Sequence, residues 1–223
     1  MIAPQSRAER DPAAKSKTDA VYESLRDAIV QGKLKPGERI NMNELARTLG
    51  ISKPPIREAV KRLEADRLLV SRIHAGATVA PIDVAEMRGV FLARETIETL
   101  VAQLAAERMD DTRFAELEDT RQAMRDALDA GTLEKMAELN SRFHQTLAQS
   151  AGHRVLHDLT EQLLLTIRRY RVTVPMGDRD WRSVVTEHDV IMDALRRRDP
   201  VAAADALRAH IGSQAVHEVE CSY

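Results

Sequence analysis

The chain contains a single cysteine, Cys221, so an internal disulfide framework is excluded. Aromatic residues make up only 3% of the composition, and no apolar run approaches the ~20 residues of a membrane-spanning helix. Residues 1–17 lack the apolar stretch of a secretory signal peptide, are polar and include two prolines, which predicts a disordered tail. These absences argue against secreted and membrane proteins, and we expect a cytoplasmic one.

Charged residues make up 30% of the chain, and their signs are unevenly distributed. Residues 18–82 carry eleven Lys and Arg against eight Asp and Glu, whereas residues 83–223 carry 18 against 25. A basic front and an acidic back are typical of a DNA-binding module joined to a module that avoids DNA. Chance variation among surface charges explains the same counts equally well.

Residues 18–82 have the pattern of a winged helix-turn-helix. Helices are predicted over 18–31, 42–49 and 52–67, with Thr18 as an N-cap and Gly50 closing the second helix. Two short strands follow, at 68–70 and 77–82, with a turn at Ala75 and Gly76. Three helices followed by a hairpin make a winged DNA-binding domain.

Residues 83–223 are helical throughout, and helices are predicted over 83–109, 112–130, 132–151, 153–174, 178–198 and 200–220. Asp83, Thr132 and Asp178 are candidate N-caps, and Pro200 suits a first helical turn. We therefore expect a mainly α protein with an N-terminal winged helix-turn-helix and a C-terminal antiparallel six-helix bundle.

The helix that starts near Ser52 has the features of a DNA-reading helix. Lys53 and Arg57 are four residues apart, so they share one face, and both can bond guanine. Pro54 and Pro55 lack the N–H groups that a capping Ser52 hydroxyl would accept, which leaves that hydroxyl available for a phosphate. The alternative is that these cations form an ordinary solvated helix face.

Three motifs in sequence resemble the GntR family of bacterial transcription regulators. They are G-x-L-x-P-G-E-x-I at 32–40, E-L-A-x-x-L-G-I-S at 44–52, and P-x-R-E-A-V-x-R-L-E at 55–64. The resemblance implies a homodimer that binds an inverted-repeat, double-stranded DNA operator. It implies these DNA-binding residues on the reading helix and the wing: Ser52, Lys53, Arg57, Arg62, His74 and Gly76.

The match departs from the family at four positions, which puts the operator sequence in doubt rather than the fold. Lys53 stands where the family usually has Arg, and Pro54 replaces a small polar residue. Arg67 replaces a common Gly before the wing, and Asn43 occupies a position where some members have a DNA-contacting Arg.

Polar side chains interrupt the apolar stripes of three bundle helices. Asn140 and His144 lie one turn apart on one helix, while His188 and His210 lie on the stripes of two others. Buried polar groups are costly unless they satisfy one another, and a transition metal satisfies several imidazoles at once. A hydrogen-bonded core is the alternative, and a metal site is the interpretation we favour.

The C-terminal 140 residues resemble the FCD ligand-binding domain of the FadR-like branch, in its six-helix VanR-like subgroup. Metal-binding members use D-x-x-x-H followed by two further histidines, which implies Asn140, His144, His188 and His210 as ligands here. Zinc is the expected metal, with nickel, iron or manganese as alternatives. Asn140 replaces the usual Asp and brings no charge, so weaker metal binding is expected.

Arg94 lies on the core-facing stripe of the first bundle helix, and a buried guanidinium needs an anion. It is either paired with a neighbouring acid such as Glu98 or clamps the carboxylate of a small organic-acid effector. The resemblance favours the effector, and Arg168 is a second candidate for contacting it.

These observations predict a metabolite-responsive transcription regulator and not an enzyme. Repression relieved by the effector is the family's habit. A metal sensor without an organic effector is one rival, and a metal-dependent hydrolase is another. Glu187, next to His188, points about 100° away from it on a helix, so it is poorly placed as a general base.

Overall fold

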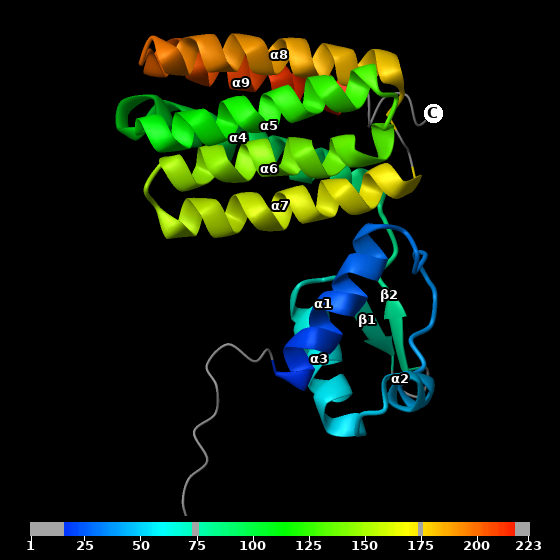
Figure 1. The fold of residues 1–223 in the computed structure, drawn as a ribbon. Helices are drawn as coiled ribbons and strands as arrows, with labels where there is room; N and C mark the ends of the chain where they lie inside the picture. The colour runs from blue at the N-terminus through cyan, green and yellow to red at the C-terminus, as the bar shows by residue number, and fades with distance from the viewer. Residues whose placement is uncertain (1–15, 73–75, 174–175, 217–223) are drawn as a thin grey trace, which may run out of the picture. The chain divides into compact units, whose positions relative to one another are not determined.

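The computed structural model describes residues 16–72, 76–173 and 176–216 (Figure 1). The chain divides into two compact units, Met1–Pro81 and Ile82–Tyr223. The first unit contains α1 (Lys17–Val30), α2 (Met42–Leu49), α3 (Lys53–Ala65), β1 (Leu69–Arg72) and β2 (Gly76–Val79). The second contains α4 (Val84–Arg108), α5 (Asp111–Asp129), η1 (Leu133–Lys135), α6 (Met136–Ser150), α7 (Arg154–Thr173), α8 (Asp178–Arg196) and α9 (Pro200–Ala215). The predicted mainly α fold class, with a winged helix-turn-helix and a helical second domain, is confirmed.

The first unit is built around the packing of α1 on α3, which contact each other extensively. The buried side chains of α1 are Val21, Leu25, Ile29 and Val30, and those of α3 are Ile56, Ala59, Val60 and Leu63. The spacing of three and four residues puts each set on one face of its helix. This leaves the polar face of α3 available to solvent.

The ends of these helices follow from local chemistry. Ser16, and not the predicted Thr18, caps α1 by accepting a hydrogen bond from the backbone N–H of Asp19. Gly50 ends α2 in the left-handed conformation, with φ of 61°, as the sequence predicts. Glycine adopts this conformation at low cost, so the chain turns sharply from α2 into α3.

The wing is a two-stranded antiparallel hairpin that pairs Leu69 with Val79 and Arg72 with Gly76. The second strand ends at Val79, three residues earlier than predicted, because Pro81 lacks the N–H that a longer ladder requires. Arg39 adds an isolated antiparallel bridge to Thr78, which ties the segment before α2 to the hairpin.

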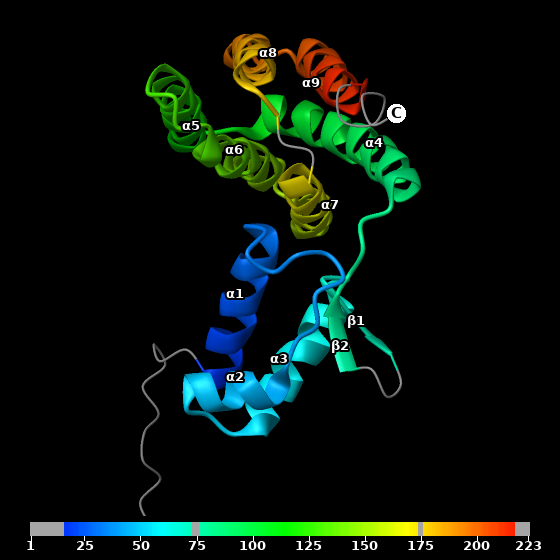
Figure 2. The same ribbon diagram turned by 90° about the vertical axis from the view of Figure 1, so that its right-hand side faces the viewer.

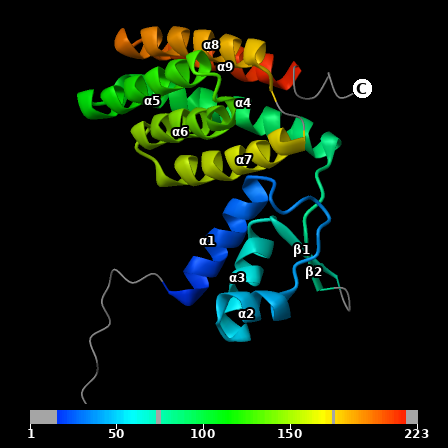
Figure 3. The same ribbon diagram turned by 45° about the vertical axis from the view of Figure 1, so that its right-hand side comes forward.

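The described part of the second unit contains a helix in each of the six predicted regions, together with η1, and α4 is its central element. It contacts α6, α7, α8 and α9, while α5 packs against α6 and α8. Figures 2 and 3 show this arrangement from two further directions, with α4 between α7 and α9. Side chains that meet inside this unit therefore come from helices far apart in sequence.

Two predicted caps in the bundle are corrected. Thr132 makes no capping bond and precedes the short turn η1, so α6 begins only at Met136. Gly177 rather than Asp178 is the N-cap of α8, and Asp180 accepts a hydrogen bond from its N–H. Asp83 caps α4 as predicted. Among the described residues, no helix is long and apolar enough to span a membrane.

Candidate functional site

The reading helix α3 begins as its sequence dictates. Ser52 is the N-cap, and its hydroxyl makes no capping hydrogen bond because prolines occupy both positions that would supply the N–H groups. Ser52, Lys53 and Arg57 are all exposed, and within the ranges described none of them forms an ion pair. The first turn of α3 therefore presents a hydroxyl, an ammonium and a guanidinium to solvent.

Arg62, a predicted DNA contact, also has partners within its own unit. Its Nη1 lies 2.6 Å from Asp19 Oδ1, and its guanidinium lies 4.3 Å from the centroid of the Tyr22 ring. The Tyr22 hydroxyl donates to Asp66, and burial together with this bond raises the pKa of Tyr22 to about 12. Arg62 thus links α3 to α1, and its predicted contact with DNA remains a prediction.

Gly76 opens β2 with a φ of 79°, a conformation that side chains rarely adopt. A Cβ at this position would lie 3.7 Å from the Arg39 guanidinium, which passes close to the hairpin. His74, the other predicted residue of the wing, lies outside the described residues.

The second unit gathers the predicted metal ligands into one buried cluster. Asn140 and His144 come from α6, His188 from α8 and His210 from α9, and each is at most 1% exposed. The ring nitrogens available as ligands lie within 4.8 Å of one another in the three histidines. The Nε2 atoms of His144 and His210 are 3.1 Å apart.

Two glutamates fix the orientation of two of these rings. His144 Nδ1 lies 2.5 Å from Glu98 Oε2, and His210 Nδ1 lies 2.7 Å from Glu187 Oε2. A carboxylate accepts a hydrogen bond from a ring N–H, so the bond to Glu187 assigns the imidazole proton of His210 to Nδ1. His210 Nε2 then carries a lone pair, and this atom lies 3.1 Å from His144 Nε2 and 3.0 Å from the Gln214 amide nitrogen.

His188 and Asn140 complete the cluster without satisfying their own polar atoms. Neither ring nitrogen of His188 and neither side-chain atom of Asn140 has a hydrogen-bond partner among the described residues. The His188 ring is held by stacking on Phe143, with ring centroids 4.0 Å apart and planes inclined by 10°. Buried polar atoms without partners cost free energy, so the cluster has unused capacity for a ligand.

Burial disfavours the charged form of all three imidazoles. Burial, reinforced by the neighbouring histidines, lowers the pKa of His188 and of His210 well below the usual value. Burial also lowers the pKa of His144, although Glu98 opposes this shift. Neutral imidazole is the form that binds metal ions.

Arg94 is fully buried, and its anion is Glu98, the pairing that the sequence left open as an alternative. Its Nε lies 2.6 Å from Glu98 Oε1, and its Nη1 donates to Gln214 Oε1 at 3.0 Å. Burial disfavours the charge of Glu98, but Arg94 and His144 outweigh it and hold the pKa of Glu98 well below its usual value. A role for Arg94 in effector binding remains a prediction.

Arg171 on α7 contacts the same glutamine as Arg94, because its Nη2 donates to Gln214 Oε1 at 3.2 Å. Arg168 is half-buried on the same helix, and its predicted effector contact remains a prediction.

Sequence reasoning did not single out Gln214, which links α9 to α4 and α7. Its spacing of four residues from His210 was the available signal, because it places the two side chains on one helix face. Glu187 was considered only as a catalytic base, whereas the structure shows it orienting His210.

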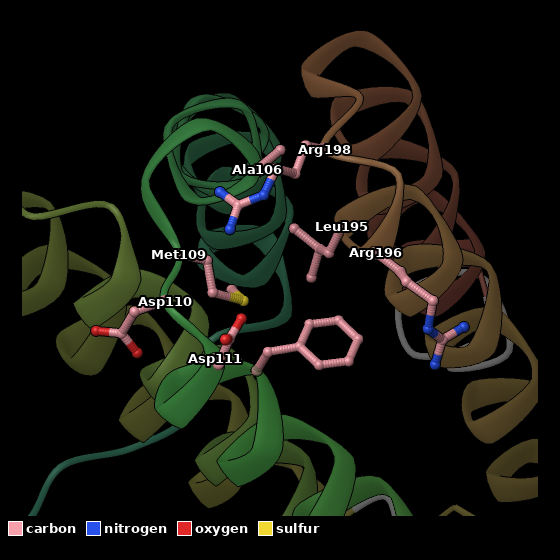
Figure 4. Close-up of a pocket in the computed structure, with 8 residues that line it drawn as sticks. Ala106, Met109, Asp110, Asp111, Leu195, Arg196 and Arg198 are labelled. Atoms are coloured by element: carbon pink, nitrogen blue, oxygen red, sulfur yellow. The ribbon is translucent and has the colours of Figure 1, made fainter.

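A separate surface hollow lies where α4, α5 and α8 meet, and none of the cluster residues line it (Figure 4). It is lined by Ala106, Met109, Asp110, Asp111, Phe114, Leu195, Arg196 and Arg198. Its charged rim and small size distinguish it from the buried, histidine-rich cluster.

Two family models match the chain. Residues 17–79 match the bacterial regulatory proteins of the gntR family, and residues 89–213 match the FCD domain. The two matches fall within the two compact units described above.

Relatives and solved structures agree with these matches. The chain is 29% identical over 197 residues, 88% of each protein, to the HTH-type transcriptional regulator YdhC of Bacillus subtilis. It is 29% identical over 191 residues to the HTH-type transcriptional repressor RspR of Escherichia coli, covering 86% of this chain and 84% of RspR.

Among solved structures, E. coli McbR/YncC aligns with a TM-score of 0.82 at 22% identity, covering 94% of this chain and all of the other. A GntR transcriptional regulator from Rhodococcus sp. RHA1 aligns over the same shares with a TM-score of 0.80 at 20% identity. The relatives are regulators and not enzymes, which removes the hydrolase alternative. The chain belongs to the gntR family of bacterial regulatory proteins with an FCD domain, and it is a DNA-binding transcription regulator.

Proposed function

We propose that the protein is a repressor whose operator binding is controlled by a small organic acid and a divalent metal in the helical domain. In this proposal a homodimer places two copies of α3 on an inverted-repeat operator. Ser52, Lys53 and Arg57 contact the DNA, together with the wing at His74 and Gly76. The naming of the relatives RspR and GlaR as repressors supports the sign of regulation.

The observation that carries the metal site is the facing pair of Nε2 atoms on His144 and His210, 3.1 Å apart. Two imidazole nitrogens this close share either a proton or a cation, and a metal ion is the cation that several neutral imidazoles bind. Ring nitrogens bound at ~2.0–2.1 Å to one zinc ion lie roughly 3.0–3.4 Å apart, so the observed spacing suits a shared metal.

The remaining donors also fit a metal. His188 and Asn140 offer buried atoms without partners, and the separation of up to 4.8 Å among the histidine nitrogens requires one ring to turn slightly inward. Glu98 and Glu187 bond the outer nitrogens of two rings, which is how carboxylates commonly orient metal-binding histidines. Zinc is the first choice for this donor set, and nickel, iron and manganese are alternatives. When bound, the metal would supply positive charge that attracts the carboxylate of an acid.

A second candidate function, a metal sensor without an organic effector, is favoured by one observation. Arg94 already has an anion in Glu98, so its burial requires no carboxylate from outside. In this version metal binding alone would control the operator.

Operator binding measured by mobility shift tests both versions. DNA fragments selected by the protein from a random pool would be titrated with zinc alone and with zinc plus a panel of organic acids. We expect release only when zinc and an acid are both present, and no response in His188→Ala. Release by zinc alone would instead establish the metal sensor, and no release under any condition would contradict both.

A further inference from the structure

Gln214 connects the histidine cluster to the buried arginines. Its Nε2 lies 3.0 Å from His210 Nε2, while its Oε1 is 3.0 Å from Arg94 Nη1 and 3.2 Å from Arg171 Nη2. The side chain is 1% exposed, so water does not replace these partners. One amide therefore joins α9 to helices α4 and α7.

The direction of this amide follows from its neighbours. Guanidinium groups only donate, so the atom facing Arg94 and Arg171 must be the oxygen. The amide nitrogen then faces His210 Nε2, which carries a lone pair because the ring proton is on Nδ1 beside Glu187. The bond from Gln214 to His210 thus uses the lone pair that the proposed metal would need.

A ring nitrogen has one lone pair, so His210 Nε2 either accepts from Gln214 or binds a metal ion. When Nε2 of Gln214 loses its acceptor in a buried site, it must turn toward another, since a buried N–H without a partner is costly. The amide is rigid and planar, so turning its nitrogen also withdraws its oxygen from the two guanidinium groups.

We infer that Gln214 couples metal binding to anion binding: with metal on His210, the amide leaves Arg94 and Arg171, and a carboxylate takes its place between them. This inference rests on the proposed metal site and deepens its regulation. A carboxylate is a stronger acceptor for guanidinium than a neutral amide oxygen, so the exchange favours an acid once the amide has turned. Arg94 Nη2, buried without a hydrogen-bond partner in the described part of the chain, offers a further donor.

Trp181 provides a direct readout. It is the chain's only tryptophan, it is buried, and the Arg171 guanidinium lies 5.0 Å from the centroid of its ring. Occupation of the arginine pair should therefore change the intrinsic fluorescence. Nitrate is a suitable probe because it has the planar shape of a carboxylate and is a poor zinc ligand, so its affinity reports on the arginines.

Nitrate affinity would be measured by Trp181 fluorescence with and without saturating zinc, in the wild type, in Gln214→Met and in the surface control Gln122→Met. In the wild type and the control, zinc should strengthen nitrate binding about tenfold, within the ~5–150-fold range usual for coupled sites. In Gln214→Met, the effect of zinc on nitrate affinity should fall well below tenfold, to the part that the metal's charge alone supplies.

If Gln214→Met binds zinc, and zinc strengthens its nitrate binding as much as in the wild type, the role of Gln214 is overturned and the metal site stays intact. Zinc binding by the wild type with no effect on nitrate would overturn the coupling itself. Failure of the wild type to bind zinc would overturn the metal site of the proposed function and the coupling with it.

Gln214→Glu serves as a second variant if Gln214→Met does not fold. It keeps an acceptor for Arg94 and Arg171 but supplies a permanent carboxylate in place of the amide. Nitrate binding should then be lost in both metal states. If folded Gln214→Glu binds nitrate as tightly as the wild type, Arg94 and Arg171 are not the anion site.

Discussion

Arg57 and Arg94 are the same side chain in opposite surroundings. Arg57 is exposed on α3 and has no acidic partner among the described residues, whereas Arg94 is fully buried between Glu98 and Gln214. In the DNA-binding unit Ser52, Lys53 and Arg57 are exposed on the surface. In the helical unit Arg94 is engaged with Glu98 and Gln214, so a ligand of this guanidinium must exchange with an existing contact.

The largest expected effect comes from breaking the buried pair. Arg94→Met leaves the Glu98 carboxylate buried without its guanidinium, which should lower the free energy of unfolding by ~3–5 kcal/mol. Urea unfolding followed by circular dichroism measures this. The double variant Arg94→Met with Glu98→Gln, which removes both charges, should regain much of the loss. If Arg94→Met is as stable as the wild type, Arg94 and Glu98 do not form a charged ion pair in the folded protein.

Arg57→Ala tests the exposed arginine of the DNA-binding unit. Loss of a guanine contact should cost ~1–3 kcal/mol of operator affinity. The free energy of unfolding should change by less than ~0.5 kcal/mol, because the side chain is exposed. Mobility shifts on operator and on unrelated DNA, with exposed Arg208→Ala in the other unit as control, separate specific from general binding. Unchanged discrimination between the two DNAs would remove Arg57 from the reading surface.

The three buried histidines predict that acid destabilises the metal-free protein. Burial lowers the pKa of His144, His188 and His210 in the folded state, so on acidification the unfolded state takes up protons that the folded state does not. Stability should therefore be unaffected above about pH 6.5, the ordinary histidine pKa. Below it, each histidine that stays neutral should cost about 1.4 kcal/mol per pH unit.

Melting temperatures of the metal-free protein between pH 7.5 and 5.5 measure this loss of stability. The control variant His157→Ala changes a residue outside the cluster and should lose stability with pH as the wild type does. A melting temperature that stays flat on acidification would contradict the neutral, buried state of the three rings.

Much of this structure is predictable from the sequence because the residue patterns that determine it lie within single helices and turns. The helices, the wing and the burial of Asn140, His144, His188 and His210 follow from residue spacing along single helices. The lack of a capping bond at Ser52 follows from two adjacent prolines. Local sequence also fixes the ends of most elements to within a few residues.

The contacts between helices are not predictable in the same way. Arg62 looks like a reading-helix cation in sequence, and only the packing of α1 on α3 brings it to Asp19 and Tyr22. Gln214 meets Arg94 across 120 positions of sequence, so no local pattern connects them. The partners of a buried polar side chain depend on which helices are neighbours, and the spacing along one helix does not contain this information.

Equilibrium dialysis against zinc, followed by elemental analysis, tests whether the four-residue cluster holds a metal ion. Wild-type protein and the surface control His157→Ala should bind one zinc ion per chain through Asn140, His144, His188 and His210. His188→Ala should lose at least about tenfold in affinity, the lower end of what even an outer-shell change costs a metal site. Wild-type protein that binds no zinc, nickel, iron or manganese, or a His188→Ala variant with full occupancy, would contradict the account.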